Sequence, residues 1–77
     1  MDKIAEDIAR LTSELKTNPS AAAYIARGKA YWAQGERRKA FNDYLAADAL
    51  QPHGEAERLI EVTTRILDYR NTDLINP

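Results

Sequence analysis

The sequence contains no cysteine and one histidine, His53. Without cysteine the chain can form neither a disulfide nor a thiolate nucleophile, and it lacks the usual ligands of a structural zinc site. His53 stands in a Pro-His-Gly turn without the serine or acidic constellation that would complete a nucleophile or a metal site. No glycine-rich phosphate loop is present. We therefore expect no catalytic residue, no metal and no cofactor, and we predict that the protein is not an enzyme.

Long apolar runs are also missing. The longest stretch without Asp, Glu, Lys or Arg is Thr17 to Ala26, 10 residues that include Pro19, whereas a membrane-spanning helix needs about 18 or more. Charged residues at positions 2, 3, 6 and 7 also argue against a signal peptide. We expect a cytoplasmic protein with no membrane partner, and 77 residues with a net charge of −1 suit one small domain.

Proline and glycine are scarce, with three of each, and they separate stretches of helical length. Ser20 is a suitable N-cap, Gly35 can end the second helix in a left-handed conformation, and Pro52 blocks continuation of the third. No stretch alternates as a strand would, so we predict an all-α fold of about four helices with antiparallel neighbours. The expected helices cover residues 2–17, 20–34, 36–50 and 55–70, followed by a tail at 71–77 without a clear period.

Three of these segments carry apolar residues at helical spacing, which predicts the faces that pack together. The residues expected on the other sides are Asp7, Arg10 and Glu14 in the first helix and Asp43 and Asp48 in the third. Glu6 stands four residues before Arg10, which is the spacing of a surface ion pair. The predicted apolar faces are Ile4, Ile8, Leu11 and Leu15; Ala40, Phe41, Tyr44, Leu45 and Ala47; and Leu59, Val62, Ile66 and Tyr69.

Residues 21–54 form a 34-residue unit that resembles a tetratricopeptide repeat (TPR). The resemblance depends on Tyr24, Gly28, Tyr31, Ala40, Tyr44, Ala47 and Pro52, together with Gly35 in the turn. It implies a fragment of a right-handed superhelix of antiparallel hairpins, in which 2–17 and 55–70 act as capping helices of one domain spanning 1–77. The C-terminal sequence is also similar to the tails of short bacterial single-repeat proteins.

Small residues in this pattern suggest a close helix crossing. Gly28 and Ala47 would let the two helices of the repeat approach, with Tyr24, Tyr31 and Tyr44 above and below them. A large side chain at Gly28 is expected to overpack the crossing, at a cost of about 1 to 3 kcal/mol.

The resemblance also implies binding of a protein partner. In the family the first helix of each repeat lines a concave face that holds a peptide or a helix, and the matching positions here are Ala22, Ile25, Lys29, Trp32 and Ala33. We therefore predict a non-catalytic adaptor or assembly module. Trp32 is the expected anchor, because tryptophan is common at protein interfaces; in a domain this small it is alternatively an ordinary core residue.

Two alternatives remain open at this stage. The concave face, with Leu74 and Ile75 of the tail, could be buried against a second copy in a homodimer. Binding of nucleic acid through Arg37, Arg38 and Lys39 is less favoured. Residues 20–54 have a local charge of only +2 in a chain that is acidic overall.

Overall fold

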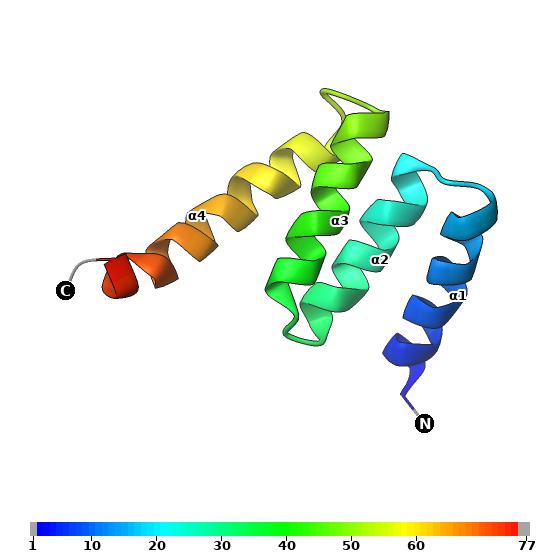
Figure 1. The fold of residues 1–77 in the computed structure, drawn as a ribbon, viewed down its shortest axis with the longest axis horizontal. Helices are drawn as coiled ribbons and strands as arrows, with labels where there is room; N and C mark the ends of the chain where they lie inside the picture. The colour runs from blue at the N-terminus through cyan, green and yellow to red at the C-terminus, as the bar shows by residue number, and fades with distance from the viewer. Residues whose placement is uncertain (1, 76–77) are drawn as a thin grey trace.

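The computed structural model describes the backbone of residues 2–75 and the side chains of residues 2–67. Within residues 2–75 the chain forms four helices and no strand (Figure 1). They are α1 (Lys3–Thr17), α2 (Ala21–Ala33), α3 (Arg37–Leu50) and α4 (Glu55–Ile75). The predicted all-α fold of helical hairpins is confirmed.

Local hydrogen bonds explain where the first helices begin and end. Asp2 accepts from the amides of Ile4 and Ala5 at the start of α1, and Ser20 Oγ accepts from the Ala23 amide at 3.1 Å at the start of α2. Each side chain satisfies first-turn amides that no helical carbonyl can reach. The predicted N-cap at Ser20 is therefore present.

Gly35 ends α2 as its sequence position indicated. Its φ of +85° lies in the left-handed region, where residues with a β-carbon are strained. The amide of Gly35 donates to the carbonyl of Trp32, and that of Glu36 donates to the carbonyl of Tyr31, both at 2.9 Å. This pair of bonds is a Schellman motif, which turns the chain directly into α3.

The last helix is longer than the sequence indicated. The predicted boundary at residue 70 is wrong, because α4 continues to Ile75 through most of the expected tail. No proline or glycine lies between Gly54 and Pro77, and polar residues such as Asn71 and Thr72 weaken a helix without stopping it. The predicted roles of Tyr69, Leu74 and Ile75 concern side chains outside the described set.

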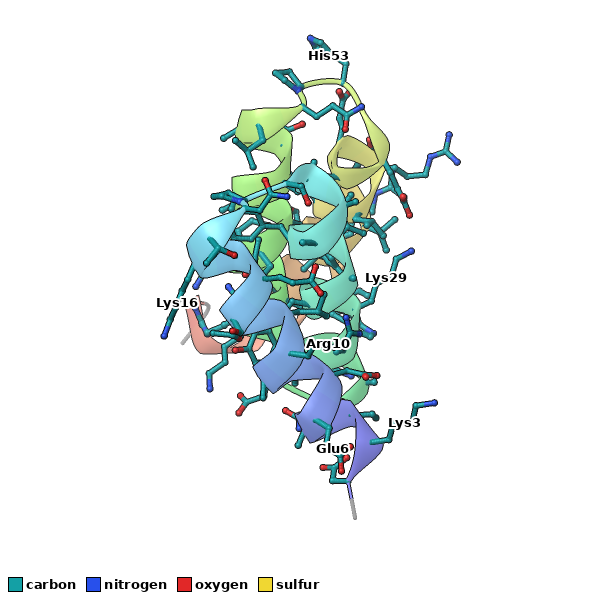
Figure 2. The ribbon with its side chains drawn as sticks, turned by 90° about the vertical axis from the view of Figure 1, so that its right-hand side faces the viewer. Lys3, Glu6, Arg10, Lys16, Lys29 and His53 are labelled. Carbon is teal, nitrogen blue, oxygen red and sulfur yellow. The ribbon has the colours of Figure 1, made fainter. Side chains whose placement is uncertain are left out.

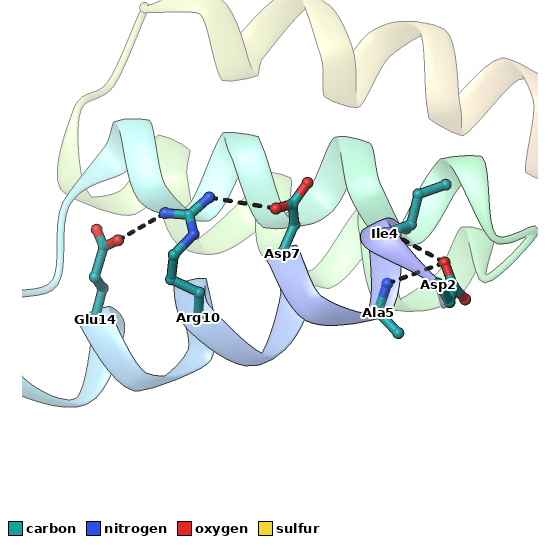
Figure 3. Close-up of polar contacts among 6 residues, drawn as sticks. All are labelled: Asp2, Ile4, Ala5, Asp7, Arg10 and Glu14. Carbon is teal, nitrogen blue, oxygen red and sulfur yellow. Dashed lines mark hydrogen bonds and ion pairs between the residues drawn. The ribbon is translucent and has the colours of Figure 1, made fainter.

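The exposed surface of α1 carries two ion pairs that share Arg10. Arg10 lies 3.6 Å from Asp7 and 3.0 Å from Glu14, one turn away on either side (Figure 3). The expected pairing of Arg10 with Glu6 is replaced by these two, which lie on the same face of the helix. On the adjoining side of α1, Leu11 and Leu15 are buried in one apolar cluster with Ala23 of α2, and the partly buried Tyr24 packs against that cluster.

The helices pack consecutively, α1 on α2, α2 on α3 and α3 on α4. Figure 1 shows them side by side in one layer, with α4 leaning away from α2 along its length. The principal extents of 44 × 34 × 16 Å describe the same flat shape. The two inner helices, α2 and α3, therefore each pack between two neighbours, whereas α1 and α4 lie at the edges of the layer.

Two predicted faces need correction. On α3 the buried residues are Ala40, Asp43, Tyr44 and Ala47, so Asp43 belongs to the packed face, whereas Leu45 is 43% exposed. Among the described side chains of α4, Ala56 and Thr63 are buried, whereas Val62, expected in the packed stripe, is 47% exposed. In both helices the helical spacing is as predicted, but the packed face points in a different direction around the helix axis from the predicted face.

Candidate functional site

An apolar groove opens between α2 and α4, with α3 at its base. Its volume is about 370 Å³. It is lined by Lys29 and Trp32 from α2, Tyr44 from α3, and Leu59, Val62, Thr63 and Ile66 from α4. The groove exists because α4 packs on α3 while diverging from α2 (Figure 1), which leaves apolar side chains of two helices facing the same space.

Trp32 is the single tryptophan of the chain and is partly buried at this groove. The guanidinium carbon of Arg37, from the start of α3, lies 5.2 Å from the centre of the indole ring. A cation at this distance from an aromatic face is attracted to its π electrons. Trp32 is thus held on one side while part of its surface faces the groove.

Lys29 forms the polar edge of the groove. Its Nζ lies 2.8 Å from Glu55 Oε2, in an ion pair that connects α2 to the first turn of α4. Both side chains are more than half exposed, so the pair adds little stability in water. Figure 2 shows Lys29 extending outward from the ribbon. The pair marks the end of the groove at which α4 begins.

Tyr44 forms the base of the groove and is only 3% exposed. Burial raises the pKa of its phenol, and the nearby carboxylates of Asp43 and Glu55 raise that pKa further. The phenol is neutral at physiological pH, as an apolar groove requires. On its other side the ring lies against Gly28 of α2.

Beside Tyr44, a polar cluster joins three helices. Arg27 donates to both oxygens of Asp43, at 2.8 Å from Nε and 2.7 Å from Nη2, and its Nη1 donates to Thr12 of α1 at 3.1 Å. The hydrogen bond to Asp43 raises the pKa of Arg27. The rings of Tyr24 and Tyr31 each lie 5.7 Å from the guanidinium carbon. The prediction that Asp43 lies off the packed face is wrong because Arg27 neutralises it there.

Of the residues predicted for the concave face, the groove contains Lys29 and Trp32. Ala22 and Ala33 are exposed on α2 and Ile25 is partly buried, and these three lie outside the groove lining. The α4 part of the groove was not predicted as a binding surface. The spacing of Leu59, Val62 and Ile66 predicts that they share one face of α4. The sequence assigns that face to packing between helices, whereas in the structure it lines the groove.

Four of the five basic residues of α2 and α3 face other groups, whereas Arg38 is exposed. Arg27 pairs with Asp43 and Lys29 with Glu55, while Arg37 lies over Trp32. Lys39 lies 3.7 Å from Glu36 and 5.5 Å from the centre of the Tyr31 ring. A phosphate backbone would have to compete with these contacts, so this geometry does not favour nucleic-acid binding.

A second, polar hollow lies at the turn between α3 and α4, where Figure 2 shows His53 at one end of the molecule. His53 is 90% exposed at its side chain, and its Nδ1 lies 2.9 Å from Glu57 Oε2. The sequence predicts no acidic group beside His53, yet Glu57, four residues later on α4, reaches back to the histidine. Within the described residues, His, Asp and Glu side chains form no group of three suited to a metal ion.

No helix within residues 2–75 is both long and apolar enough to cross a membrane. No protein-family model, curated protein or solved structure matches this chain.

Proposed function

We propose that this chain is a non-catalytic protein-interaction module of the tetratricopeptide type, which binds an apolar helix or peptide of a protein partner in the groove between α2 and α4. The observation that carries the proposal is Trp32, a partly buried tryptophan in an apolar groove of about 370 Å³. Tryptophan side chains that fill such sites commonly contribute much of the binding energy at protein interfaces.

The size of the groove suits a few side chains. Its volume of about 370 Å³ is roughly two to three times the ~150 Å³ cavity that accommodates a benzene ring. Two or three apolar side chains would fill it, which is the number that an amphipathic helix or short peptide presents on one face. Lys29 and Glu55 at the edge provide polar groups that can fix the orientation of such a segment.

The resemblance to the repeat family supports the same function. Gly28 and Tyr44, two residues of the repeat pattern, lie against each other between α2 and α3. Lys29 and Trp32 match sequence positions at which members of that family bind partners. A module of this kind would act as an adaptor or assembly factor, with the cytoplasm as its expected location.

The test is capture of partner proteins by the tagged full chain, compared with Trp32→Ala and a control, Leu45→Ala. Leu45 is a similarly apolar, exposed residue outside the groove. We expect at least one protein to be captured by the wild type and by Leu45→Ala but lost with Trp32→Ala, with helicity unchanged by circular dichroism. Undiminished capture by a folded Trp32→Ala variant would count against the proposal.

A further inference from the structure

We infer that the partner in the groove is a second copy of this chain, whose α4 places its own Leu59, Val62 and Ile66 against the groove of the first. The inference rests on the proposed function, because it names the occupant of the same groove. The arrangement is symmetric, so each copy covers the other's Trp32 with the face of α4 that carries these three residues.

The accessible surface of the chain is larger than that of a compact monomer. It amounts to 5512 Å² for a mass of 8.7 kDa, whereas folded monomers of this mass expose about 4,700 Å². The excess of roughly 800 Å² equals the area that each partner buries in a standard protein interface. The radius of gyration, 13.4 Å, likewise exceeds the ~11.5 Å of a compact domain of this length.

The single layer of helices explains this excess. Globular domains normally bury the apolar faces of one layer against a second layer. Here the thickness is 16 Å, and among the described residues no large side chain is fully buried. A second copy packed face to face would provide the missing layer.

The α4 face fits the groove in size and spacing. Leu59, Val62 and Ile66 follow the i, i+3, i+7 pattern of one helical stripe, and three side chains match the capacity of the groove. Val62, at the middle of the stripe, is 47% exposed although it is apolar. Because the same residues line the groove, two copies present identical surfaces to each other, as a two-fold interface requires.

The charge of the chain permits this association. Two copies that each carry a net charge of −1 repel only weakly, and proteins near neutrality associate more readily than highly charged ones. A partner of different sequence could match the groove, but the surface excess, the stripe and the low charge are all properties of the chain itself.

The inference can be tested by sedimentation equilibrium of the full chain from micromolar to millimolar concentration. We expect the mass to rise from 8.7 kDa toward twice that value. The fluorescence of Trp32, the single tryptophan, should shift to the blue over the same range as its ring loses water. A chain that stays monomeric throughout, with unchanged emission, would overturn the inference.

Two matched substitutions locate the interface. Val62→Glu should raise the dimer dissociation constant at least about tenfold, because it places a charge in the groove. Leu45→Glu adds the same charge at a similarly exposed residue, 43% against 47%, and should change the constant by less than about twofold. If Val62→Glu does not fold, Val62→Ser provides the same comparison with a milder change. Dimers unaffected at Val62, or weakened equally at Leu45, would overturn the inference.

Failure of this inference can be separated from failure of the proposed function. A monomeric wild type that still captures a different protein through Trp32 overturns the second copy as occupant and supports the groove as a binding site. A monomer whose capture is insensitive to Trp32→Ala overturns both.

Discussion

Tyr44 fills the space that a side chain at Gly28 would occupy. A β-carbon added to Gly28 would lie 2.6 Å from Tyr44 Cε1 and 2.9 Å from Tyr44 Cδ1, well inside van der Waals contact. Tyr44 is buried, so its ring cannot easily move aside. Gly28 is therefore closely packed against α3, but its nearest neighbours are the Tyr44 ring and the β-carbon of Asp43, and not Ala47, which the sequence pairs with it.

Gly28→Ala should lower the free energy of unfolding by about 2 kcal/mol. Overpacking at the upper end of its usual range costs about 3 kcal/mol, and the better helix propensity of alanine recovers about 1 kcal/mol. Chemical denaturation measures the change. In a Tyr44→Ala background the same substitution should instead stabilise the protein by up to about 1 kcal/mol; equal effects in both backgrounds would show that the contact with Tyr44 is not responsible.

The ion pair of Arg27 and Asp43 leads to a second prediction. Asp43→Asn should lower the free energy of unfolding by about 3 kcal/mol, because it leaves a largely buried guanidinium without its counter-charge. Replacing both residues, Arg27→Met with Asp43→Leu, should lower the free energy of unfolding by less than Asp43→Asn alone, since no uncompensated charge remains. Urea denaturation of the three proteins checks this order, and a double variant less stable than Asp43→Asn would contradict it.

The raised pKa of Tyr44 predicts a loss of stability at alkaline pH. Its pKa in the folded chain is raised above the ordinary value of 10.0, so the folded state resists the deprotonation that the unfolded state undergoes. Its contribution to stability is fully present below pH 10 and is lost as pH rises through the raised pKa. The wild type should therefore lose more stability than Tyr44→Phe above pH 10, measured as the shift of the denaturation midpoint. Parallel profiles for the two proteins would refute this assignment.

The turn between α3 and α4 holds a strained residue. His53 has a φ of +63°, in the left-handed region that costs a residue with a β-carbon about 1 kcal/mol. His53→Gly should raise the free energy of unfolding by about 0.5 kcal/mol, because relief of strain exceeds the entropy that glycine adds to the unfolded chain. His53→Ala removes the contact with Glu57 but keeps the strain, so thermal unfolding should show no gain for it. A gain of equal size in both variants would point to the imidazole and not to the backbone.

Comparison of the turn with the helix ends shows which details a sequence can reveal. Ser20 and Gly35 act through bonds to residues within four positions, so their roles were predictable from local sequence. At the α3–α4 turn the left-handed conformation is adopted by His53, although glycine, the residue type that favours it, stands next in the chain at Gly54. The choice between two neighbouring residues depends on how α4 must leave the turn to pack on α3.

The sequence by itself determined the helices, because capping, proline placement and helical periodicity act over a few residues. It also determined which residues share a face, including Leu59, Val62 and Ile66 on α4. Only the tertiary structure decided what each face meets. Asp43 is packed because Arg27, 16 residues away, reaches it, and the stripe on α4 lines an open groove because α4 diverges from α2. Periodicity fixes the relative directions of side chains around one helix, whereas the partner of a face depends on the angle at which a second helix packs.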